Sequence, residues 1–267
     1  TLNALEAARE CGFSSISIDL IYGLPLQTPA SFQRTLERVI ELGPDRISIF
    51  NYAHMPELFK TQRGIREQDL PSAALKLALL RGSIETLTGA GYVYIGMDHF
   101  AKPDDELAIA QRAGALHRNF QGYATHADCD LVGLGITAIG TVGDSFAQNV
   151  KTLDGYYARI DSGRLPVYRG VELSADDYLR RAVIMQLICQ FELDIAALEA
   201  AYSVVFRDYF AAEQPRLAQM VEDGLLTLSD RSLSVTSRGR LLIRNICMVF
   251  DSYLSPSDPQ QRFSKAI

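Results

Sequence analysis

Residues 14–25 read SSISIDLIYGLP, a β-patterned run that stops at a Gly-Leu-Pro turn. Alternation with a period of two separates its side chains into two faces. One face is apolar and comprises Ile16, Ile18, Leu20 and Tyr22. The other face is partly polar and comprises Ser17, Asp19, Ile21 and Gly23. Strands covered by helices on both sides are usually apolar on both faces. The polar face therefore predicts a sheet that turns one side toward a ligand.

Helical and strand patterns alternate through the first half of the chain. Apolar residues recur at helical spacing in residues 2–11, 32–40 and 72–88. Runs with a strand-like pattern cover residues 14–22, 46–52 and 92–96. This order predicts that the three strands pair in parallel through right-handed crossovers. Three strands do not complete a barrel, and Thr1 opens the chain inside a helical pattern. We therefore expect a piece of a longer protein.

The second half has a different organisation. Residues 102–149 are irregular and rich in Asp, His, Arg and Gly, and residues 162–170 resemble a linker. Helices are predicted over 174–189, from Asp194 onward, over 206–223 and over 238–253, with a hairpin over 225–235. The sequence thus predicts an α/β domain in residues 1–165, followed by a mostly helical, winged-helix-like domain in residues 166–267.

Composition and charge exclude several classes of protein. The 267 residues are 48% hydrophobic and 22% charged, with a net charge of −6, which argues against a general nucleic-acid or membrane binder. The four cysteines are far apart and form no Cys-x-x-Cys pair, so no metal site is expected. With no export signal, we expect a cytoplasmic protein with reduced thiols. We also expect a monomer.

Several charged residues are candidates for a site. Asp19 lies near the end of its strand, where it would contact ribose hydroxyls or a ligand ammonium, or else pair with a core cation. His54, Asp98 and His99 follow two further strands, but their spacing is not diagnostic of a metal site and also suits loop ordering. Arg112 and Arg118 form a cationic segment suited either to an anionic substrate or to a solvated surface.

Five blocks of sequence are more distinctive, namely IDLIYGLP (18–25), FNYAHMP (50–56), IGMDHFAKPDDELA (95–108), HRNFQGYATHADCDLVGLGITAIG (117–140) and TSRGRLLIRNICMVFD (236–251). They resemble the oxygen-independent coproporphyrinogen III oxidase (dehydrogenase) family of radical S-adenosyl-L-methionine (SAM) enzymes. The resemblance covers essentially the whole chain. It implies the C-terminal part of an incomplete (β/α)6 radical SAM barrel in residues 1–165.

The resemblance also implies a reaction and its cofactors. Two propionates of coproporphyrinogen III become vinyl groups in porphyrin and haem biosynthesis, giving protoporphyrinogen IX and carbon dioxide without oxygen. A [4Fe-4S] cluster reduces SAM, of which the enzyme holds two molecules, and external electron donors and acceptors complete the cycle. The resulting 5′-deoxyadenosyl radical abstracts a hydrogen atom from the substrate.

Individual residues acquire roles from the same resemblance. Asp19, Ala53 and Ile139 match SAM-contacting positions, and Ile21 and Phe50 lie beside two of them and are expected to pack against adenine. Arg112 and Arg118 are our own candidates for binding the substrate propionates. The Cys-x-x-x-Cys-x-x-Cys motif of the family has no counterpart here, so the cluster ligands are expected outside this chain, which alone should be inactive.

Two other functions stay open from the sequence. A haem chaperone of the same superfamily shares the IYGLP-type segment, although the MDHFA and RNFQGY blocks resemble the oxidase. A ligand-sensing regulator is the second alternative, because Arg238, Arg240 and Arg244 on a winged-helix-like end are suited to contacting DNA phosphates.

Overall fold

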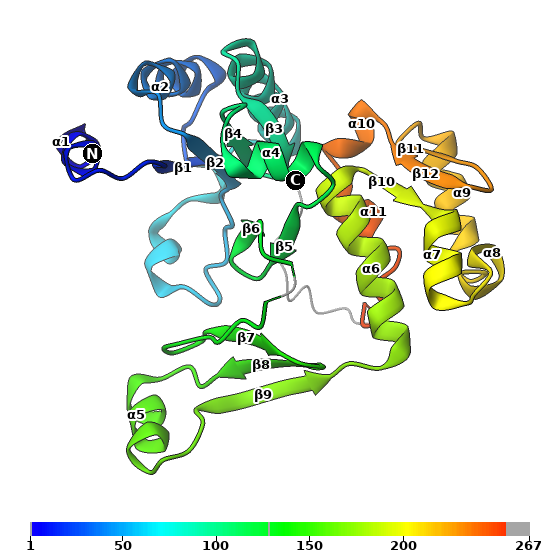
Figure 1. Ribbon diagram of the computed structural model, residues 1–267. Helices are drawn as coiled ribbons and strands as arrows, with labels where there is room; N and C mark the ends of the chain where they lie inside the picture. Colours follow the sequence, from blue (N-terminus) through cyan, green and yellow to red (C-terminus); the bar gives the residue numbers. More distant parts are fainter. Residues whose placement is uncertain (1, 128, 255–267) are drawn as a thin grey trace.

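The computed structural model describes residues 2–127 and 129–254. Its N-terminal half is built on a parallel pair of strands (Figure 1). Helix α1 (Leu2–Glu10) precedes β1 (Ser17–Tyr22), and α2 (Pro29–Leu42) connects β1 to β2 (Arg46–Asn51). The strands pair in parallel, with Asp19 opposite Ser48 and Ile21 opposite Phe50. The predicted alternation is confirmed, because exposed Ser17, Asp19 and Ile21 alternate with more buried neighbours.

The third predicted strand exists but pairs differently. After α3 (Ala73–Gly89), β3 (Val93–Gly96) reverses into β4 (His99–Ala101), and β4 lies between β2 and β3 in the order β1-β2-β4-β3. Strand β4 is antiparallel to both neighbours. The expectation of three adjacent parallel strands is therefore wrong. The cause is a tight reversal after β3, in which Gly96 (φ 144°) and Met97 (φ 51°) adopt positive φ, so that β4 returns between β2 and β3.

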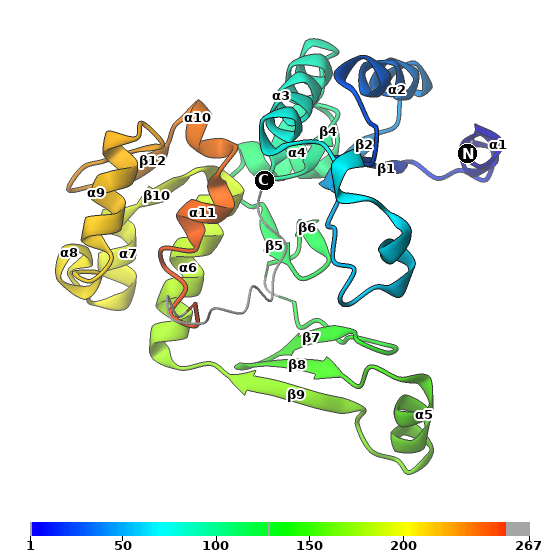
Figure 2. The ribbon, with the colours of Figure 1, turned by 180° about the vertical axis from the view of Figure 1, so that it is seen from behind.

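Helices α2 and α3 cover one face of this sheet, as both views show (Figures 1 and 2), and the other face is exposed along β1 and at Phe50 of β2. The covered face packs a buried apolar cluster from the strands and the two helices. Its members include Tyr22, Phe32, Leu36, Ile47, Ile49, Leu79, Leu87 and Phe100. The opposite face carries Asp19, Ile21 and Phe50, which are all exposed. The sheet therefore has one structural face and one face available to a ligand.

The middle of the chain is more regular than predicted. It contains 3₁₀ turns η1 (Lys60–Gly64) and η2 (Glu67–Asp69), then α4 (Glu106–Arg112) and a hairpin of β5 (His117–Asn119) and β6 (Gly122–Ala124). Strands β7 (Ile139–Val142), β8 (Ser145–Asn149) and β9 (Val167–Glu172) form an antiparallel sheet, with α5 (Leu153–Asp161) between β8 and β9. The predicted linker over 162–170 is thus wrong in part, because backbone pairing with β8 makes residues 167–172 a strand.

The C-terminal half is mostly helical, as expected. It contains α6 (Ala175–Gln190), β10 (Glu192–Asp194), α7 (Ile195–Tyr202), α8 (Phe206–Tyr209), α9 (Gln214–Glu222), β11 (Leu226–Leu228), β12 (Ser232–Val235), α10 (Ser237–Arg240) and α11 (Ile243–Cys247). Ser174 and Asp177 form the predicted capping box, and the predicted hairpin is β11–β12. The helices predicted over 206–223 and 238–253 are each broken into two. Pro215 starts α9 as a new helix, since proline suits a first turn and not an interior.

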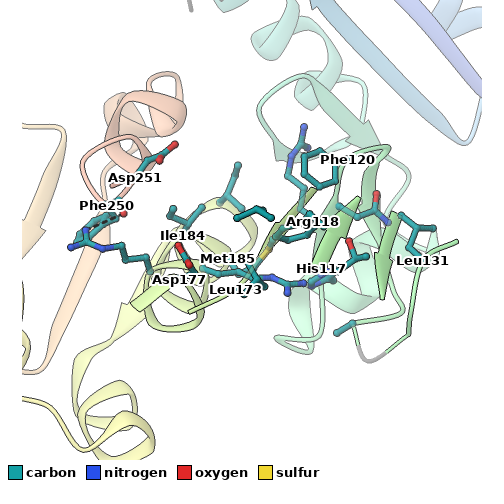
Figure 3. Close-up of a pocket in the computed structure, with 18 of the residues that line it drawn as sticks. His117, Arg118, Phe120, Leu131, Leu173, Asp177, Ile184, Met185, Phe250 and Asp251 are labelled. Carbon is teal, nitrogen blue, oxygen red and sulfur yellow. Dashed lines mark hydrogen bonds between the residues drawn. The ribbon is translucent and has the colours of Figure 1, made fainter. Parts of the chain in front are cut away.

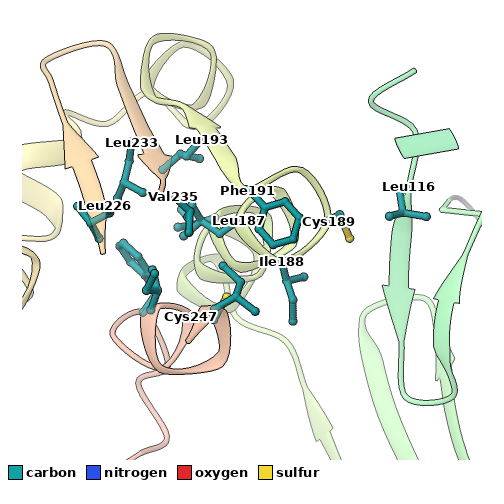
Figure 4. Close-up of a cluster of buried hydrophobic side chains, with 14 of the residues drawn as sticks. Leu116, Leu187, Ile188, Cys189, Phe191, Leu193, Leu226, Leu233, Val235 and Cys247 are labelled. Carbon is teal, nitrogen blue, oxygen red and sulfur yellow. The ribbon is translucent and has the colours of Figure 1, made fainter. Parts of the chain in front are cut away.

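Helix α6 joins the two halves through a second hydrophobic core. Its side chains Leu187 and Ile188 pack with residues of the three-stranded sheet β10-β12-β11 (Figure 4). The same cluster includes Ile95, Leu107 and Tyr123 from the first half of the chain. The cluster therefore fixes the β5–β6 hairpin against α6. Within the described residues, no helix is long and apolar enough to span a bilayer.

Gly239 provides a test of this packing. A Cβ atom there would overlap the carbonyl oxygen of Leu225 and lie 2.8 Å from its carbonyl carbon, so the backbone must move. We expect Gly239→Ala to lower the free energy of unfolding by about 3 kcal/mol, as severe overpacking does. The matched control is Gly82→Ala within α3, where no atom lies within 4 Å and a gain of about 1 kcal/mol is expected. Urea unfolding measures both, and equal stabilities would contradict the packing.

Candidate active site

A row of polar side chains crosses the open face of the sheet. Asp19 on β1 pairs in register with Ser48 on β2, and Ser48 pairs with His99 on β4. Residues in register point to the same face, and neighbouring strands lie about 4.8 Å apart. Asp19 and His99 are therefore separated by roughly two strand spacings. Ile21 and Phe50 form the next row, so an apolar surface lies directly beside the carboxylate.

His99 is held in place by aromatic contacts. Its ring meets Phe50 at 6.1 Å and Tyr123 at 5.2 Å between ring centroids, both in edge-to-face geometry. Nδ1 of His99 is buried and has no hydrogen-bond partner. The pKa of His99 is lowered to about 4, chiefly by burial and then by the Arg118 cation, while the charge of Asp19 opposes the shift. The imidazole is therefore neutral at physiological pH.

Arg118 on β5 lies close to His99. Its guanidinium stacks on Tyr123, with the central carbon 4.6 Å from the ring centroid. Nη1 of Arg118 is buried without a hydrogen-bond partner. Burial raises the pKa of Asp98, and the positive charges of Arg244 and Arg118 oppose that rise. A cation and a neutral imidazole thus stand beside the open face of the sheet.

A cavity of about 610 Å³ opens next to Arg118 (Figure 3). It lies between the β5 hairpin, the β7-β8-β9 sheet and α6. Most of its wall is apolar, and its cations are Arg118, Arg180 and Arg181. Arg181 stacks over Phe146 at 5.3 Å, and Arg180 is paired with Asp176 and Glu213. The cavity has the size and the mixture of apolar and cationic groups that suit a large acidic ligand.

The predicted site residues lie in different parts of the structure. Asp19, Ile21 and Phe50 share the open face, and Ala53 follows the end of β2, with its carbonyl accepting a hydrogen bond from Gln62 at 3.0 Å. Ile139 begins β7, two residues before Thr141 of the cavity wall.

The two predicted substrate arginines lie apart. Arg118 lines the cavity, but Arg112 is exposed at the end of α4 and donates to the carbonyl of Pro103 at 2.8 Å. Sequence reasoning missed Phe146 and Arg181 as members of the cavity wall. No local pattern indicated either residue, because the two meet through a contact between distant elements.

The thiols of this chain do not fit an iron–sulfur cluster. Cys11 and Cys129 are exposed, whereas Cys189 and Cys247 are buried, and burial raises the pKa of each buried thiol to about 12. Residues 2–127 and 129–254 contain no group of three or more His, Cys, Asp or Glu side chains able to hold a metal ion. The open face does fit an adenosyl group, because the Asp19 carboxylate stands beside the exposed apolar side chains of Ile21 and Phe50.

The chain is similar in sequence and in structure to known proteins. The HemN C-terminal domain family matches residues 173–242. The oxygen-independent coproporphyrinogen III oxidase of Thermostichus vulcanus is 48% identical over 264 residues, covering 98% of this chain and 81% of that protein. The chain belongs to the oxygen-independent coproporphyrinogen III oxidase family.

Longer members of the family are also similar. The enzymes of that name from Escherichia coli (strain K12) and Pseudomonas aeruginosa are each 54% identical, over 263 and 267 residues. This chain spans 58% of the length of both. A solved structure titled "Coproporphyrinogen III oxidase (HemN) from Escherichia coli is a Radical SAM enzyme" matches with a TM-score of 0.91, covering 95% of this chain and 58% of that one. The mixed α/β fold is therefore that of this radical SAM relative.

Proposed function

We propose that this chain, within a protein of its relatives' length, carries out the oxygen-independent decarboxylation of coproporphyrinogen III to protoporphyrinogen IX in haem biosynthesis. The observation that carries the proposal is that a partly polar, partly apolar sheet face lies close to a cavity lined by cations. Asp19, Ile21 and Phe50 form the face. Arg118 lines the cavity and stacks on Tyr123, whose ring contacts His99 of the same sheet. The family membership reported above supports the same activity.

The open face of the sheet is proposed to bind SAM. Asp19 accepts hydrogen bonds from ribose hydroxyls or pairs with the ammonium group, while Ile21 and Phe50 pack against adenine. Ala53 and Ile139 contact the two SAM molecules through backbone or apolar atoms. When bound, SAM supplies the radical that abstracts hydrogen from the substrate. The ligands of the [4Fe-4S] cluster belong to the part of the relatives that this chain does not cover.

The cavity beside Arg118 is proposed to hold the tetrapyrrole. Each of the two reacting propionates loses a β-hydrogen atom and one electron, and carbon dioxide leaves as the vinyl double bond forms. Arg118 orients a carboxylate through its guanidinium, and the apolar wall excludes water from the reacting carbon. Arg112 is a peripheral contact at most, because its guanidinium is bonded to Pro103. An external donor supplies the electron that reduces SAM, and an external acceptor takes the electron that each reacting propionate releases.

The finer architecture is part of the same proposal. The segments β1-α2 and β2-α3 are two units of an incomplete (β/α)6 radical SAM barrel, within a catalytic domain of residues 1–165. The order α6-β10-α7-α8-α9-β11-β12 corresponds to a winged-helix arrangement within residues 166–267. We propose that the protein acts as a cytoplasmic monomer that binds neither nucleic acid nor a membrane.

Neither alternative function has a specific observation in its favour. The relatives described above are named as oxidases, which does not support a haem chaperone. Two of the three arginines considered for DNA binding have partners inside the protein. Arg240 stacks on Phe191 at 4.4 Å, and the positive charge of Arg244 opposes the rise in the pKa of Asp98.

The decisive experiment uses the full-length protein, reconstituted with iron and sulfide in the absence of oxygen. Supplied with SAM, a reductant and coproporphyrinogen III, it should release carbon dioxide and form protoporphyrinogen IX, detected by chromatography after oxidation to the porphyrin. Omitting SAM is the control and should abolish the product. Stable haem binding and transfer without a vinyl product would overturn the proposal in favour of a chaperone.

A further inference from the structure

Two buried nitrogen atoms, one of them on a residue that lines the cavity, lack hydrogen-bond partners. They are Nη1 of Arg118 and Nδ1 of His99. A buried donor without a partner costs about 1–3 kcal/mol, and more when the group is charged, so such atoms are rare in folded proteins. Both groups contact the ring of Tyr123, which brings them to the same place in the fold.

No side chain of the described residues neutralises this cation at close range. None of the ion pairs between residues 2–127 and 129–254 includes Arg118. Asp98 and Asp19 act on the Arg118 and His99 pair only through their longer-range charge. A guanidinium held against an aromatic ring with a free N–H is suited to an incoming carboxylate.

Resting on the proposed function, we propose that Arg118 Nη1 and His99 Nδ1 form one subsite that binds a ligand carboxylate. Arg118 supplies the positive charge, and the neutral imidazole donates one N–H. The edge-to-face contacts with Phe50 and Tyr123 fix the His99 ring, so little rotamer freedom is lost when the carboxylate binds.

The charge of the subsite sets its selectivity. Because burial and Arg118 keep His99 neutral, the subsite presents a single positive charge to a single negative one. A carboxylate is matched, whereas a phosphate dianion would leave charge uncompensated. Since Arg118 lines the cavity, we assign the carboxylate to a propionate of the tetrapyrrole. The carboxylate of the methionine part of SAM offers the same chemistry from a second source.

The test compares ligands that differ in their carboxylates, using the full-length protein. Fluorescence measures the binding of coproporphyrin III, which has four carboxylates, and of mesoporphyrin IX, which has two. Arg118→Gln should weaken coproporphyrin III binding about tenfold or more, and His99→Phe about fivefold, with a smaller effect on mesoporphyrin IX. His99→Gln, which keeps an N–H donor, should restore part of the loss. Arg164→Gln is the control, since Arg164 is exposed on the loop before β9.

Parallel titrations with SAM and with decarboxylated SAM identify the source of the carboxylate. Losses confined to SAM would show that the subsite serves the cofactor and would overturn the assignment to a propionate. Unchanged binding of both ligand classes in Arg118→Gln and His99→Phe would remove the subsite altogether. Failure of the unmodified protein to bind either porphyrin would instead contradict the proposed function.

Discussion

Replacing Asp19 by Ala in the full-length protein should abolish formation of the vinyl product. The Asp19 side chain is exposed on the open face and makes no side-chain hydrogen bond within the described residues, so its removal should leave the fold intact. Loss of charged hydrogen bonds to ribose or ammonium removes about 1.5–3 kcal/mol each, and two such bonds correspond to about a thousandfold loss of SAM affinity.

Three measurements separate binding from folding in the Asp19→Ala variant. SAM affinity by calorimetry should fall steeply, vinyl product should drop below detection, and iron and sulfide content should match the unmodified protein. Asp161→Ala at the exposed end of α5 serves as the control, because it removes one carboxylate far from the sheet. Unchanged SAM affinity in Asp19→Ala would take this residue out of the binding site.

The open face of β1 could be predicted because strand periodicity acts locally. A period of two in residues 17–22 places Asp19 and Ile21 together without knowledge of any other element. Parallel pairing through α2 then brings Phe50 beside Ile21. The shared face of Asp19, Ile21 and Phe50 therefore follows from short-range patterns, and the structure has this arrangement as the sequence indicates.

The place of His99 could not be predicted in the same way. The reversal between β3 and β4 depends on Met97 at φ 51°, a conformation that no sequence rule assigns to methionine. A strand as short as His99–Ala101 also lacks enough residues to establish a period. His99 was consequently expected in a loop, whereas hydrogen bonding to β2 places it in the sheet, in register with Ser48.

The cavity wall depends on contacts between distant parts of the chain. Arg181 on α6 stacks on Phe146 of β8, and Tyr123 donates to the carbonyl of Ile188 at 2.9 Å. These contacts arise because α6 packs against two sheets at once. Propensity and periodicity describe single elements, so neither could bring these residues together.

Replacing Val171 by Trp should block the cavity without disturbing the SAM site. Val171 lies on β9 opposite Phe146, is 39% exposed and lines the cavity, so an indole there projects into the space proposed for the tetrapyrrole. Trp suits a strand position, and the exposed site avoids overpacking a core. We expect kcat/KM for coproporphyrinogen III to fall about a hundredfold, because much of the binding volume is lost.

The control for Val171→Trp is Tyr168→Trp on the same strand. Tyr168 does not line the cavity, is 57% exposed and contacts Lys151 through its ring. Tyr168→Trp should keep its full activity, and both variants should bind SAM as the unmodified protein does. Normal turnover in Val171→Trp would mean that the tetrapyrrole binds elsewhere, because a ligand that needs this cavity cannot share it with an indole.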